Sequence, residues 1–347
     1  MPDFAHRLIR WHQIHGRHDL PWQNTRDPYR IWVSEIMLQQ TQVAAVIPYF
    51  QRFMARFPDI ASLAAAPIDS VLEHWSGLGY YARARNLHAA AQLIVAQGKF
   101  PQAVADIAAL PGIGRSTAAA IGAFAFGVRG AILDGNVKRV LARCFGIAGY
   151  PGEAAVQNRL WALAESLLPA TAIEIYTQAL MDLGATLCTR SRPRCGTCPM
   201  QAQCVAHLTQ RTAELPTAKA KGVLPQRETV MLILQLGGQQ GGQHGAEVLL
   251  EKRPSSGIWG GLWSFPEIER AAILQTQLIQ RFGVQARRVM PLAPLAHSFT
   301  HYRLSILPLW VETSAPSQTK PGQIWLALEE ARGAAIPTPV RKLLDRL

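Results

Sequence analysis

Four of the five cysteines lie close together in the second half of the chain, with the spacing C-x6-C-x2-C-x5-C. Thiolates this close in sequence can converge on one centre, and sulfur ligands select zinc or an iron–sulfur cluster. Two disulfides are the alternative, but they need an oxidising compartment, and the N-terminal residues show no apolar secretory signal. We therefore expect a metal centre held by Cys188, Cys195, Cys198 and Cys204.

The spacing also bears on which metal is bound. Zinc sites usually combine two close pairs of ligands, whereas here only Cys195 and Cys198 form a close pair. This favours a 4Fe-4S cluster over zinc. The segment carries three arginines, and no acidic residue occurs between Asp182 and Glu214, so a phosphate backbone is the expected neighbour.

Length and charge limit the possible classes of protein. A chain of 347 residues is long for one core, so two domains are expected. Its 49% hydrophobic and 17% charged residues are typical of a globular protein, and no apolar run is long enough to cross a membrane. The net charge of +12 indicates a polyanionic partner such as nucleic acid, although it could serve only solubility. We expect a cytoplasmic, nucleoid-associated protein of bacterial type.

The first half of the chain is predicted to be helical. Hydrophobic residues recur at helical spacing, and proline and glycine separate the segments. The predicted helical segments are 28–57, 61–75, 81–97, 103–110, 115–126, 136–145, 153–167 and 172–187.

The pattern changes after a polar, basic and proline-containing stretch, which has the composition of a linker. Strands are then predicted at 230–236, 247–253, 303–312 and 323–328, with a glycine-rich connection after the first and a helix at 268–283. We therefore predict three parts. They are a mainly α domain at 1–209 that includes a cluster loop at 188–204, a linker at 210–226, and a smaller α+β domain at 227–347.

The segment 107–124 reads as helix, tight turn, helix, with LPGIG at the turn. Gly112 and Gly114 let the backbone approach a phosphate, and the amides that begin the second helix can bind this anion. An ordinary helix–helix corner is the alternative. The pattern favours a helix-hairpin-helix that contacts DNA.

Two carboxylates stand out by their surroundings. Asp134 lies at or just before the start of a helix that begins near Asn136. Aspartate is a favoured N-cap, and the helix N-terminus would also keep this carboxylate ionised. Glu35 shares a helix face with Ile31, Trp32 and Leu38, so desolvation should raise its pKa and make it a proton donor near neutral pH. A structural glutamate paired with an arginine is the alternative for Glu35.

Together these motifs resemble the helix-hairpin-helix DNA glycosylase superfamily, whose motif ends in an aspartate at the position of Asp134. The cysteine spacing is similar to that of its endonuclease III branch. LPW at 20–22 and SEIMLQQTQV at 34–43 resemble the MutY-type adenine DNA glycosylases. Ser116 occupies the position at which the endonuclease III branch has its Schiff-base lysine, and that branch lacks the second domain. The resemblance implies a helix-hairpin-helix glycosylase domain with an iron–sulfur cluster loop and a smaller, Nudix-like C-terminal domain.

The resemblance also implies a reaction. The expected substrate is adenine paired with 8-oxoguanine, or with guanine, in double-stranded DNA, and the enzyme is expected to be a monomer. Glu35 would protonate N7 of adenine, Asp134 would stabilise the oxocarbenium-like sugar, and Asn136 would help to hold this site. Glycoside hydrolysis likewise uses two carboxyl groups, of which one is protonated and the other is ionised. Because Ser116 replaces the lysine, base removal without an efficient lyase step is expected.

Base excision requires that adenine leave the base stack. By resemblance, Tyr80 and Gln39 would fill the space left in the duplex, and Trp22 would line the adenine pocket. Gly112, Gly114 and Ser116 are expected on the DNA-binding surface as well. Without the resemblance, Tyr80 and Trp22 would be read as core aromatic residues.

The second domain resembles the Nudix fold that this family uses to recognise the oxidised guanine. Phe299, Thr300 and His301 correspond to a lesion-sensing turn that usually reads Phe-Ser-His, so the threonine adds a methyl group beside the hydroxyl. The residues that follow Gly257 lack the acidic cluster of a Nudix hydrolase. No Mg²⁺ is therefore expected to be required for catalysis.

Two other functions remain open from the sequence. One is a bifunctional glycosylase and lyase of the endonuclease III type that acts on oxidised pyrimidines, which Ser116 and the second domain disfavour. The other is a non-catalytic protein that binds damaged DNA, which the presence of both Glu35 and Asp134 disfavours.

Overall fold

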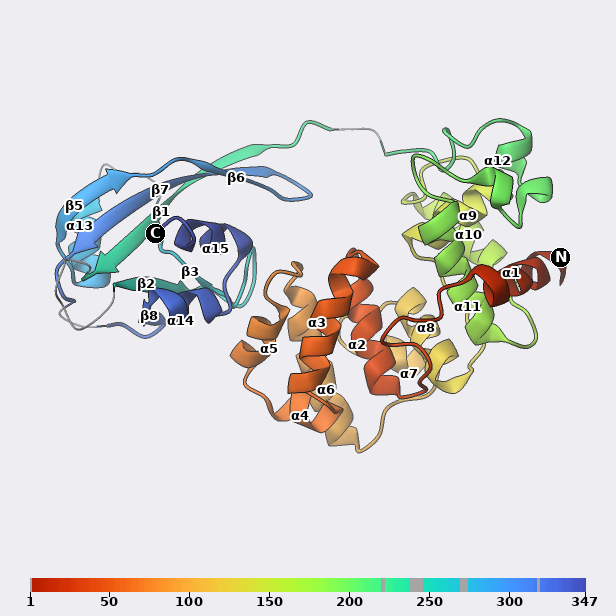
Figure 1. The fold of residues 1–347 in the computed structure, drawn as a ribbon, viewed down its shortest axis with the longest axis horizontal. Coiled ribbons are helices and arrows are strands. Elements are labelled where there is room, and N and C mark those ends of the chain that lie inside the picture. Colours follow the sequence, from red (N-terminus) through yellow and green to blue (C-terminus); the bar gives the residue numbers. More distant parts are fainter. Residues whose placement is uncertain (1, 220–221, 238–245, 269–273, 317–318) are drawn as a thin grey trace. The chain divides into compact units, whose positions relative to one another are not determined.

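The structure is a computed structural model, and it describes residues 2–219, 222–237, 246–268, 274–316 and 319–347. The chain divides into two compact units (Figure 1). The first, called the helical unit here, comprises Met1–Ala65 and Asn86–Lys221. The second, called the sheet unit, comprises Ala66–Arg85 and Gly222–Leu347.

The helical unit is built from short and medium helices joined by tight turns. Its α-helices are α1 (Pro2–His15), α2 (Pro28–Leu38), α3 (Val43–Arg56), α4 (Ile60–Ala65), α6 (Ala82–Gln97, whose first turn belongs to the sheet unit), α7 (Val104–Ala108), α8 (Arg115–Phe126), α9 (Gly135–Cys144), α10 (Ala154–Ser166), α11 (Ile173–Asp182) and α12 (Val205–Leu208). A π-helical turn, η1 (Leu183–Leu187), and two 3-10 turns, η2 (Cys195–Thr197) and η3 (Gln201–Gln203), complete it.

Two of the predicted helical segments are interrupted. The segment 28–57 breaks into α2 and α3 because Gln40 adopts a left-handed conformation with φ of 57° and Gln42 is extended. The segment 61–75 breaks into α4 and α5 (Ile68–Trp75) at Pro67, whose extended backbone precedes α5. The predictions of one continuous helix in each segment were therefore wrong.

Helix α1 was not predicted, and it packs against α11. The core of the helical unit is shared by α1, α8, α9, α10 and α11, and it includes Leu8, Val140, Leu160, Tyr176 and Leu183. This shared core fixes where α9 begins, and the first turn of α9 carries Asp134 and Asn136.

The predicted helix-hairpin-helix is present as α7, a turn at 109–114, and α8. Gly112 has φ of 76°, and a Cβ atom at this position would lie 2.7 Å from Cβ of Asn86. Both the conformation and the close packing therefore require glycine here. Gly114 is the N-cap residue of α8, so no side chain of the cap residue bonds to the first backbone amides of this helix.

Asp182 is fully buried and ties together α1, α11 and the segment that follows α1. Its carboxylate accepts hydrogen bonds from the backbone N of Arg17 at 2.8 Å, from Nε of Arg17 at 2.9 Å and from Nε2 of Gln178 at 2.8 Å. Nε2 of His12 lies 3.4 Å away. Burial alone would raise the pKa of Asp182, but the hydrogen bonds from His12 and Arg17 outweigh it, so the pKa is lowered.

The sheet unit has a mixed sheet with the strand order β3-β2-β1-β7-β5, while β4 pairs with β1, β6 with β7 and β8 with β2. The strands are β1 (Gln226–Leu236), β2 (Glu247–Lys252), β3 (Trp263–Ser264), β4 (Glu267–Ile268), β5 (Ala286–Pro291), β6 (Leu295–Ser298), β7 (Arg303–Thr313) and β8 (Gln323–Ala327). Strands β1 and β7 run parallel, and the other paired strands are antiparallel. The four predicted strands correspond to β1, β2, β7 and β8.

Successive residues of β1 face opposite sides of the sheet, as the strand period requires. Val230 and Leu232 belong to a core that includes the π-helical turn η5 (Leu278–Phe282), which follows α13 (Leu274–Gln277). Met231 and Ile233 belong to a core on the other face that includes α14 (Leu328–Gly333) and α15 (Thr338–Leu344).

The helix predicted at 268–283 is only partly present. Ile268 ends a strand, β4, and helical structure extends over α13 and η5. Residues 269–273 lie outside the described residues, as do 238–245 of the predicted glycine-rich connection.

Helix α5 and the residues that follow it belong to the sheet unit although they come early in the chain. Oγ of Ser76 donates a hydrogen bond to the carbonyl oxygen of Ile336 at 2.9 Å. Lys252 forms an ion pair with Asp69. Leu72 and Trp75 of α5 are buried. The sequence pattern contains no sign of this association.

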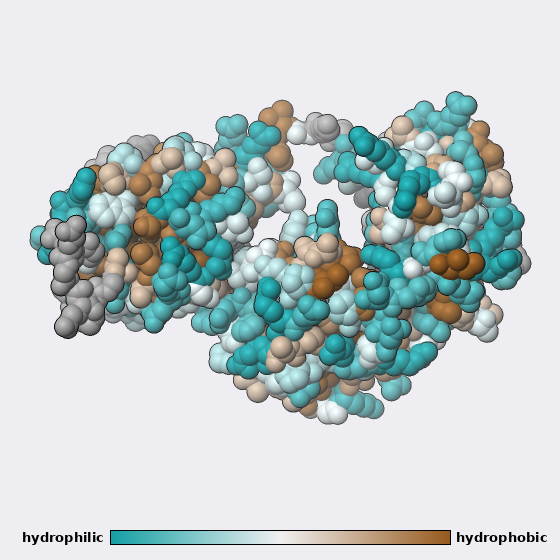
Figure 2. Space-filling model, in the orientation of Figure 1, coloured by the Kyte–Doolittle hydropathy of each residue, from teal (hydrophilic) through white to brown (hydrophobic). Residues whose placement is uncertain are grey.

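Hydrophilic residues predominate on the face drawn in Figure 2, and hydrophobic residues are scattered among them. Large hydrophobic side chains that are exposed include Ile14 (76%), Leu208 (64%) and Val223 (98%). Single exposed residues of this kind are usual in folded proteins. Among the helices formed by the described residues, none is long and apolar enough to span a membrane.

Replacing Asp182 by asparagine should destabilise the protein, because the charge that pairs with Arg17 is removed from a buried site. The expected loss is about 3–5 kcal/mol in the free energy of unfolding. The lowered pKa means that this stabilisation is present above the unfolded-state pKa of about 3.9 and is lost as the pH falls through the folded-state pKa.

Urea unfolding of the wild type and of Asp182→Asn at pH 3 to 7 measures this effect. The difference should be largest at neutral pH and shrink below about pH 4. Asp19→Asn, at an exposed position, is the control and should change stability by less than about 0.5 kcal/mol. Equal stability of Asp182→Asn and wild type at pH 7 would contradict the assignment.

Candidate active site

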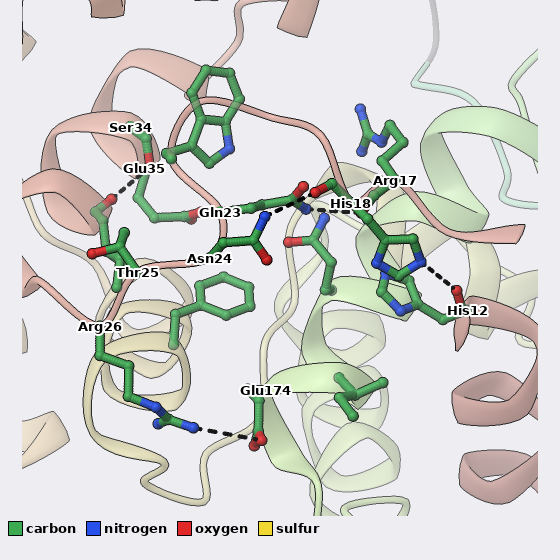
Figure 3. A pocket seen from close by; sticks show the side chains of 15 residues that line it. His12, Arg17, His18, Gln23, Asn24, Thr25, Arg26, Ser34, Glu35 and Glu174 are labelled. Atoms are coloured by element: carbon green, nitrogen blue, oxygen red, sulfur yellow. Dashed lines mark hydrogen bonds and ion pairs between the residues drawn. The ribbon is translucent and has the colours of Figure 1, made fainter. Parts of the chain in front are cut away.

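Two pockets in the helical unit meet at Glu35. The larger one, called the two-carboxylate pocket here, has a volume of about 750 Å³ and is lined by both Glu35 and Asp134. The smaller one, called the side pocket, has a volume of about 430 Å³ (Figure 3). Both pockets are lined by Arg17, Trp22, Glu35 and Gln178.

Glu35 projects from α2, whose other faces are buried. Asp27 caps this helix by accepting a hydrogen bond from the backbone N of Tyr29 at 2.9 Å, and Pro28 occupies its first turn. Burial raises the pKa of Glu35 to about 8, and the negative charge of Asp134 adds to this rise. The predicted effect of desolvation on Glu35 is therefore confirmed. Within the described residues, no arginine or lysine forms an ion pair with Glu35. The alternative of a structural glutamate paired with an arginine is therefore not supported.

Asp134 is the N-cap residue of α9, and its Oδ1 accepts a hydrogen bond from the backbone N of Val137 at 2.7 Å. The predicted cap is confirmed, and the amides of Val137 and Asn136 favour the ionised carboxylate as expected, but they are not the largest influence on its pKa. Burial raises the pKa of Asp134, because desolvation outweighs the hydrogen bonds from the amides of Val137 and Asn136.

Opposite protonation states of the two carboxylates follow, because the charge on one raises the pKa of the other. Because the charge of Asp134 is one reason for the raised pKa of Glu35, Asp134 ionises first as the pH rises. Glu35 then keeps its proton up to a pH of about 8. The pocket therefore holds one negative charge and one proton donor at neutral pH.

Asn136 is fixed by an arginine on the next turn of α9. Nη2 of Arg139 donates hydrogen bonds to Oδ1 of Asn136 and to the carbonyl oxygen of Gly184, both at 2.7 Å. Nε of Arg139 donates to the carbonyl oxygen of Cys188 at 2.7 Å. The first turn of α9 is thereby linked to η1 and to the first cysteine of the predicted metal centre.

The two-carboxylate pocket brings together most of the site residues predicted in this unit. They are Trp22, Glu35, Gln39, Gly114, Ser116, Asp134 and Asn136, whereas Gly112 does not line it. Gln39 ends α2, and its Nε2 donates to Oγ1 of Thr117 at 3.3 Å. Oγ of Ser116 accepts a hydrogen bond from the backbone N of Leu133 at 2.9 Å. These contacts join α2, α8 and the start of α9 around one space.

Trp22 is both a core residue and part of the pocket wall. It is buried, and its ring packs edge-on against that of Phe50 with a centroid distance of 5.4 Å. Its segment is held by Gln23, whose Nε2 donates to the carbonyl oxygen of Arg17 at 3.0 Å and whose Oε1 accepts from the N of Leu20 at 3.0 Å.

Arg17 and Gln178 line both pockets and were not predicted as site residues. Both are held by Asp182, which accepts hydrogen bonds from each. Gln178 lies one helical turn before Asp182 on α11, a spacing that is compatible with any helix. No sequence signal distinguished either residue from the many other polar residues of the helical half.

The predicted wedge residue, Tyr80, belongs to the sheet unit. It is 45% exposed and has a left-handed conformation with φ of 51°. The loop beneath it is held by Arg83, whose Nη2 donates to the carbonyl oxygens of Leu78 at 3.3 Å and Gly79 at 3.2 Å. An exposed aromatic ring therefore stands on a loop with a fixed backbone.

The predicted lesion-sensing residues form the turn between β6 and β7. The backbone N of Phe299 donates to the carbonyl oxygen of Tyr302 at 2.9 Å. Thr300 and His301 are exposed at the tip, with Oγ1 of Thr300 lying 3.4 Å from Nδ1 of His301. Trp259 was not predicted here, yet its ring lies 5.4 Å from that of Phe299.

The four clustered cysteines line one cavity, and Cys144 also lines it. All of them are free thiols. The guanidinium of Arg143 donates to Sγ of Cys188 at 3.4 Å and to the carbonyl oxygen of Thr189 at 2.7 Å. A hydrogen bond from Cys144 lowers the pKa of Cys204 to about 6. A buried arginine and a hydrogen-bonded thiolate would stabilise a negatively charged metal centre that has sulfur ligands.

The donors do not surround a single ion. Within the described residues, no three His, Cys, Asp or Glu side chains lie close enough together to hold one metal ion. Four thiols that line one cavity can supply sulfur ligands to a metal centre.

Two family models match the chain. Residues 33–166 match the model of the HhH-GPD superfamily base excision DNA repair protein, and residues 241–346 match that of the NUDIX domain. The helical fold is similar to a thermostable thymine-DNA glycosylase, with a TM-score of 0.54 and 30% identity over 59% of this chain and 95% of that one. An endonuclease III in complex with DNA has a TM-score of 0.51 and 20% identity, over 60% of this chain and 94% of that one, and this similarity concerns the fold alone.

Relatives of known activity extend along the whole chain. The adenine DNA glycosylase of Buchnera aphidicola subsp. Baizongia pistaciae (strain Bp) is 37% identical over 99% of this chain and 96% of its own length. The adenine DNA glycosylase of Homo sapiens is 34% identical over 98% of this chain and 73% of its own length. Identity at this level over both domains, with a pocket that contains two carboxylates, shows that the chain belongs to the MutY-type adenine DNA glycosylases.

Proposed function

We propose that this DNA glycosylase removes adenine paired with 8-oxoguanine or guanine in double-stranded DNA by hydrolysing the N-glycosidic bond. The observation that carries the proposal is the two-carboxylate pocket, which both Glu35 and Asp134 line and in which burial raises the pKa of Glu35 to about 8. The pocket's volume of about 750 Å³ is ample for one purine nucleotide, and its position beside the hairpin of α7 and α8 suits an extruded base.

In this proposal, Glu35 donates its proton to N7 of adenine, so the base leaves as a neutral group. A positioned general acid contributes roughly 10²–10⁴-fold to a rate. Asp134 faces the sugar and stabilises the positive charge that develops as the bond breaks. Asn136, held by Arg139, keeps the first turn of α9 in place behind Asp134. Water then completes the hydrolysis.

We further propose that the reaction stops at base removal. An efficient lyase step needs an amine that attacks the sugar, and the side chain of Ser116 offers only a hydroxyl that is already hydrogen-bonded to the backbone of Leu133. The enzyme is thus proposed to be monofunctional. We also propose that it acts as a monomer and requires no Mg²⁺ for catalysis.

Recognition of the duplex is proposed to be divided along the chain into the three parts expected from the sequence: a glycosylase domain at 1–209, a linker at 210–226, and a lesion-recognition domain at 227–347. The backbone at Gly112 and Gly114 binds phosphate, Trp22 and Gln178 line the space for adenine, and Gln39 enters the gap left in the duplex. In the sheet unit, Tyr80 is the wedge. Phe299, Thr300 and His301 contact the oxidised guanine.

We propose that Cys188, Cys195, Cys198 and Cys204 bind one 4Fe-4S cluster. When bound, the cluster would supply a structural centre that fixes the loop 188–204, and no step of the reaction passes through it. The contacts of Arg143 with this loop support the proposal, because a buried cation compensates the negative charge of a thiolate-bound cluster.

Replacing Glu35 by glutamine should leave binding to a duplex with adenine opposite 8-oxoguanine intact and lower the single-turnover excision rate by about 10²–10⁴-fold. Glutamine keeps the size of the side chain but cannot donate the proton. Glu174→Gln is the matched control, because Glu174 lines the side pocket without lining the two-carboxylate pocket, and it should excise at a rate close to that of the wild type. Near-normal turnover in Glu35→Gln would overturn the role of this residue.

The wild-type excision rate should also depend on pH. Only protonated Glu35 is active, and its pKa is about 8, so the single-turnover rate should be constant at neutral pH. Above a pH of about 8 it should fall about tenfold per pH unit. A rate that stays constant up to pH 10 would be inconsistent with this acid.

A set of four duplexes tests the substrate and the absence of a lyase step. Adenine opposite 8-oxoguanine and adenine opposite guanine should be excised. Adenine opposite thymine and an oxidised pyrimidine should not be. Strand cleavage should appear only after treatment with alkali, because Ser116 cannot form a Schiff base. Cleavage without alkali, or excision of the pyrimidine, would refute the proposal.

The purified protein should be brown, with a visible absorption band and about four iron atoms per chain, as a 4Fe-4S cluster requires. Cys198→Ser should lose most of the iron, because one ligand is removed. Cys144→Ser, the control, should retain it, since Cys144 contacts Cys204 but is not a ligand. A colourless protein that contains zinc would disprove the assignment.

A further inference from the structure

The sheet unit contains two predicted DNA-contacting elements that are far apart in the sequence. One is the wedge loop with Tyr80, and the other is the lesion-sensing turn, which comprises residues 299–302. Neither the sequence nor the relatives indicate whether these two elements act separately. The contacts inside this unit show what lies between them.

The loop Gly257–Leu262, called the bridging loop here, is a compact structure. The backbone N of Leu262 donates to the carbonyl oxygen of Trp259 at 3.1 Å, and Nε of Arg253 donates to that of Ile258 at 3.0 Å. A Cβ atom at Gly260 would lie 2.7 Å from the carbonyl oxygen of Ser255, so only glycine fits.

Trp259 has a conformation that is unusual for a large residue. Its φ of 55° is left-handed, which is costly for a side chain other than glycine, asparagine or aspartate. Strain of this kind persists only where the surrounding structure enforces it, and it is concentrated at functional sites. The conformation of the bridging loop is therefore fixed at the residue that contacts the lesion-sensing turn.

One side of the bridging loop packs on the lesion-sensing turn. The ring of Trp259 lies 5.4 Å from that of Phe299 and 5.7 Å from that of His297. Phe299 in turn lies 6.1 Å from His301, centroid to centroid. A displacement of the turn on contact with a base would therefore press directly on Trp259.

The other side of the bridging loop holds the wedge segment. The carbonyl oxygen of Gly260 accepts a hydrogen bond from Nη1 of Arg85 at 2.5 Å. A Cβ atom at Gly261 would lie 3.6 Å from Cδ1 of Leu72 on α5, so the loop is in close contact with this helix. Arg85 lies in the first turn of α6, where the backbone N of Arg83 already bonds to the carbonyl oxygen of Tyr80.

The loop that carries Tyr80 is also attached through Ser76 and Tyr81, so it cannot move freely. The carbonyl oxygen of Ile336, which is fully buried, accepts from Oγ of Ser76 at 2.9 Å and from the hydroxyl of Tyr81 at 3.5 Å. Nη2 of Arg341 donates to Oγ of Ser76 at 3.2 Å. Tyr80 therefore stands between two attachments to the C-terminal part of the chain.

We propose that the bridging loop couples recognition of the base opposite adenine to insertion of Tyr80, with Trp259 and Arg85 as positioning residues. This inference rests on the proposed function and adds to it a link between lesion recognition and base extrusion. The link runs from the lesion-sensing turn through the ring of Trp259 and the carbonyl oxygen of Gly260 to Arg85 and the wedge. Coupling of two sites requires an element that both contact, and the bridging loop is such an element.

The test uses the full-length protein and duplexes in which 2-aminopurine replaces the target adenine, because its fluorescence rises when it leaves the base stack. The partner base is 8-oxoguanine or guanine. At saturating protein, the wild type should give a larger rise opposite 8-oxoguanine. In Arg85→Ala and in Trp259→Ala this difference should shrink by roughly fivefold or more, since fivefold is the lower end of a typical coupling between sites.

Two controls separate coupling from a general loss of structure. Trp259→Phe keeps an aromatic ring against Phe299 and should behave like the wild type. Arg346→Ala removes an arginine that donates to the carbonyl oxygen of Ala293 at 2.8 Å elsewhere in the sheet unit, and it should leave the difference unchanged. Thermal unfolding establishes that each variant is folded. The proposal would be overturned if Arg85→Ala and Trp259→Ala both showed the same difference in fluorescence between 8-oxoguanine and guanine as the wild type.

The same samples distinguish this inference from the proposed function, because excision is measured separately on unmodified adenine. A wild type that excises adenine opposite 8-oxoguanine but shows no dependence of fluorescence on the partner base would refute the coupling alone. A wild type that shows this dependence, lost in the two variants, without excising adenine would refute the proposed chemistry and support the coupling.

Discussion

Desolvation of two carboxylates around one pocket is the constraint on which the rest of the structure depends. Glu35 and Asp134 both have raised pKa values because both are withdrawn from water. A single pocket cannot easily hold two buried negative charges, so one group retains a proton. The α9 N-terminus favours Asp134 as the ionised group through two backbone amides, whereas the pKa of Glu35 is raised by desolvation and by the charge of Asp134. The proton donor and the anion are thus assigned by backbone geometry.

The helical fold supports this arrangement from several directions. Asp182 holds Arg17 and Gln178 against the pocket, and the same hydrogen bonds tie the segment with Trp22 to α11. Arg139 fixes the first turn of α9 to η1. Asp182 is buried, and the partly buried side chains of Arg17, Gln178 and Arg139 are all hydrogen-bonded, which makes them costly to rearrange. The wall of the two-carboxylate pocket is consequently well fixed.

Much of this site could be predicted from the sequence, for identifiable reasons. The cap at Asp134 and the hydrophobic face around Glu35 follow from local patterns, and local patterns are preserved in the fold. The break at Gln40 could not be predicted, because a left-handed glutamine is imposed by packing rather than by its own preference. The burial of Asp134, which raises its pKa, could not be predicted because it depends on which helices surround this residue. Arg17, Gln178 and Trp259 lie in positions whose importance arises only from distant contacts.

The division of the chain into units has a consequence for how the protein matures. The sheet unit is discontinuous, because Ala66–Arg85 are synthesised long before the strands that they pack against. During translation, Ser76 and Tyr81 are made more than 200 residues before Ile336, whose carbonyl oxygen accepts their hydrogen bonds. Contacts between such distant parts of a chain form slowly, since a long loop has to close first. A nascent or truncated chain that ends before α14 would therefore lack the carbonyl oxygen of Ile336, and the segment that carries Tyr80 would lose this attachment.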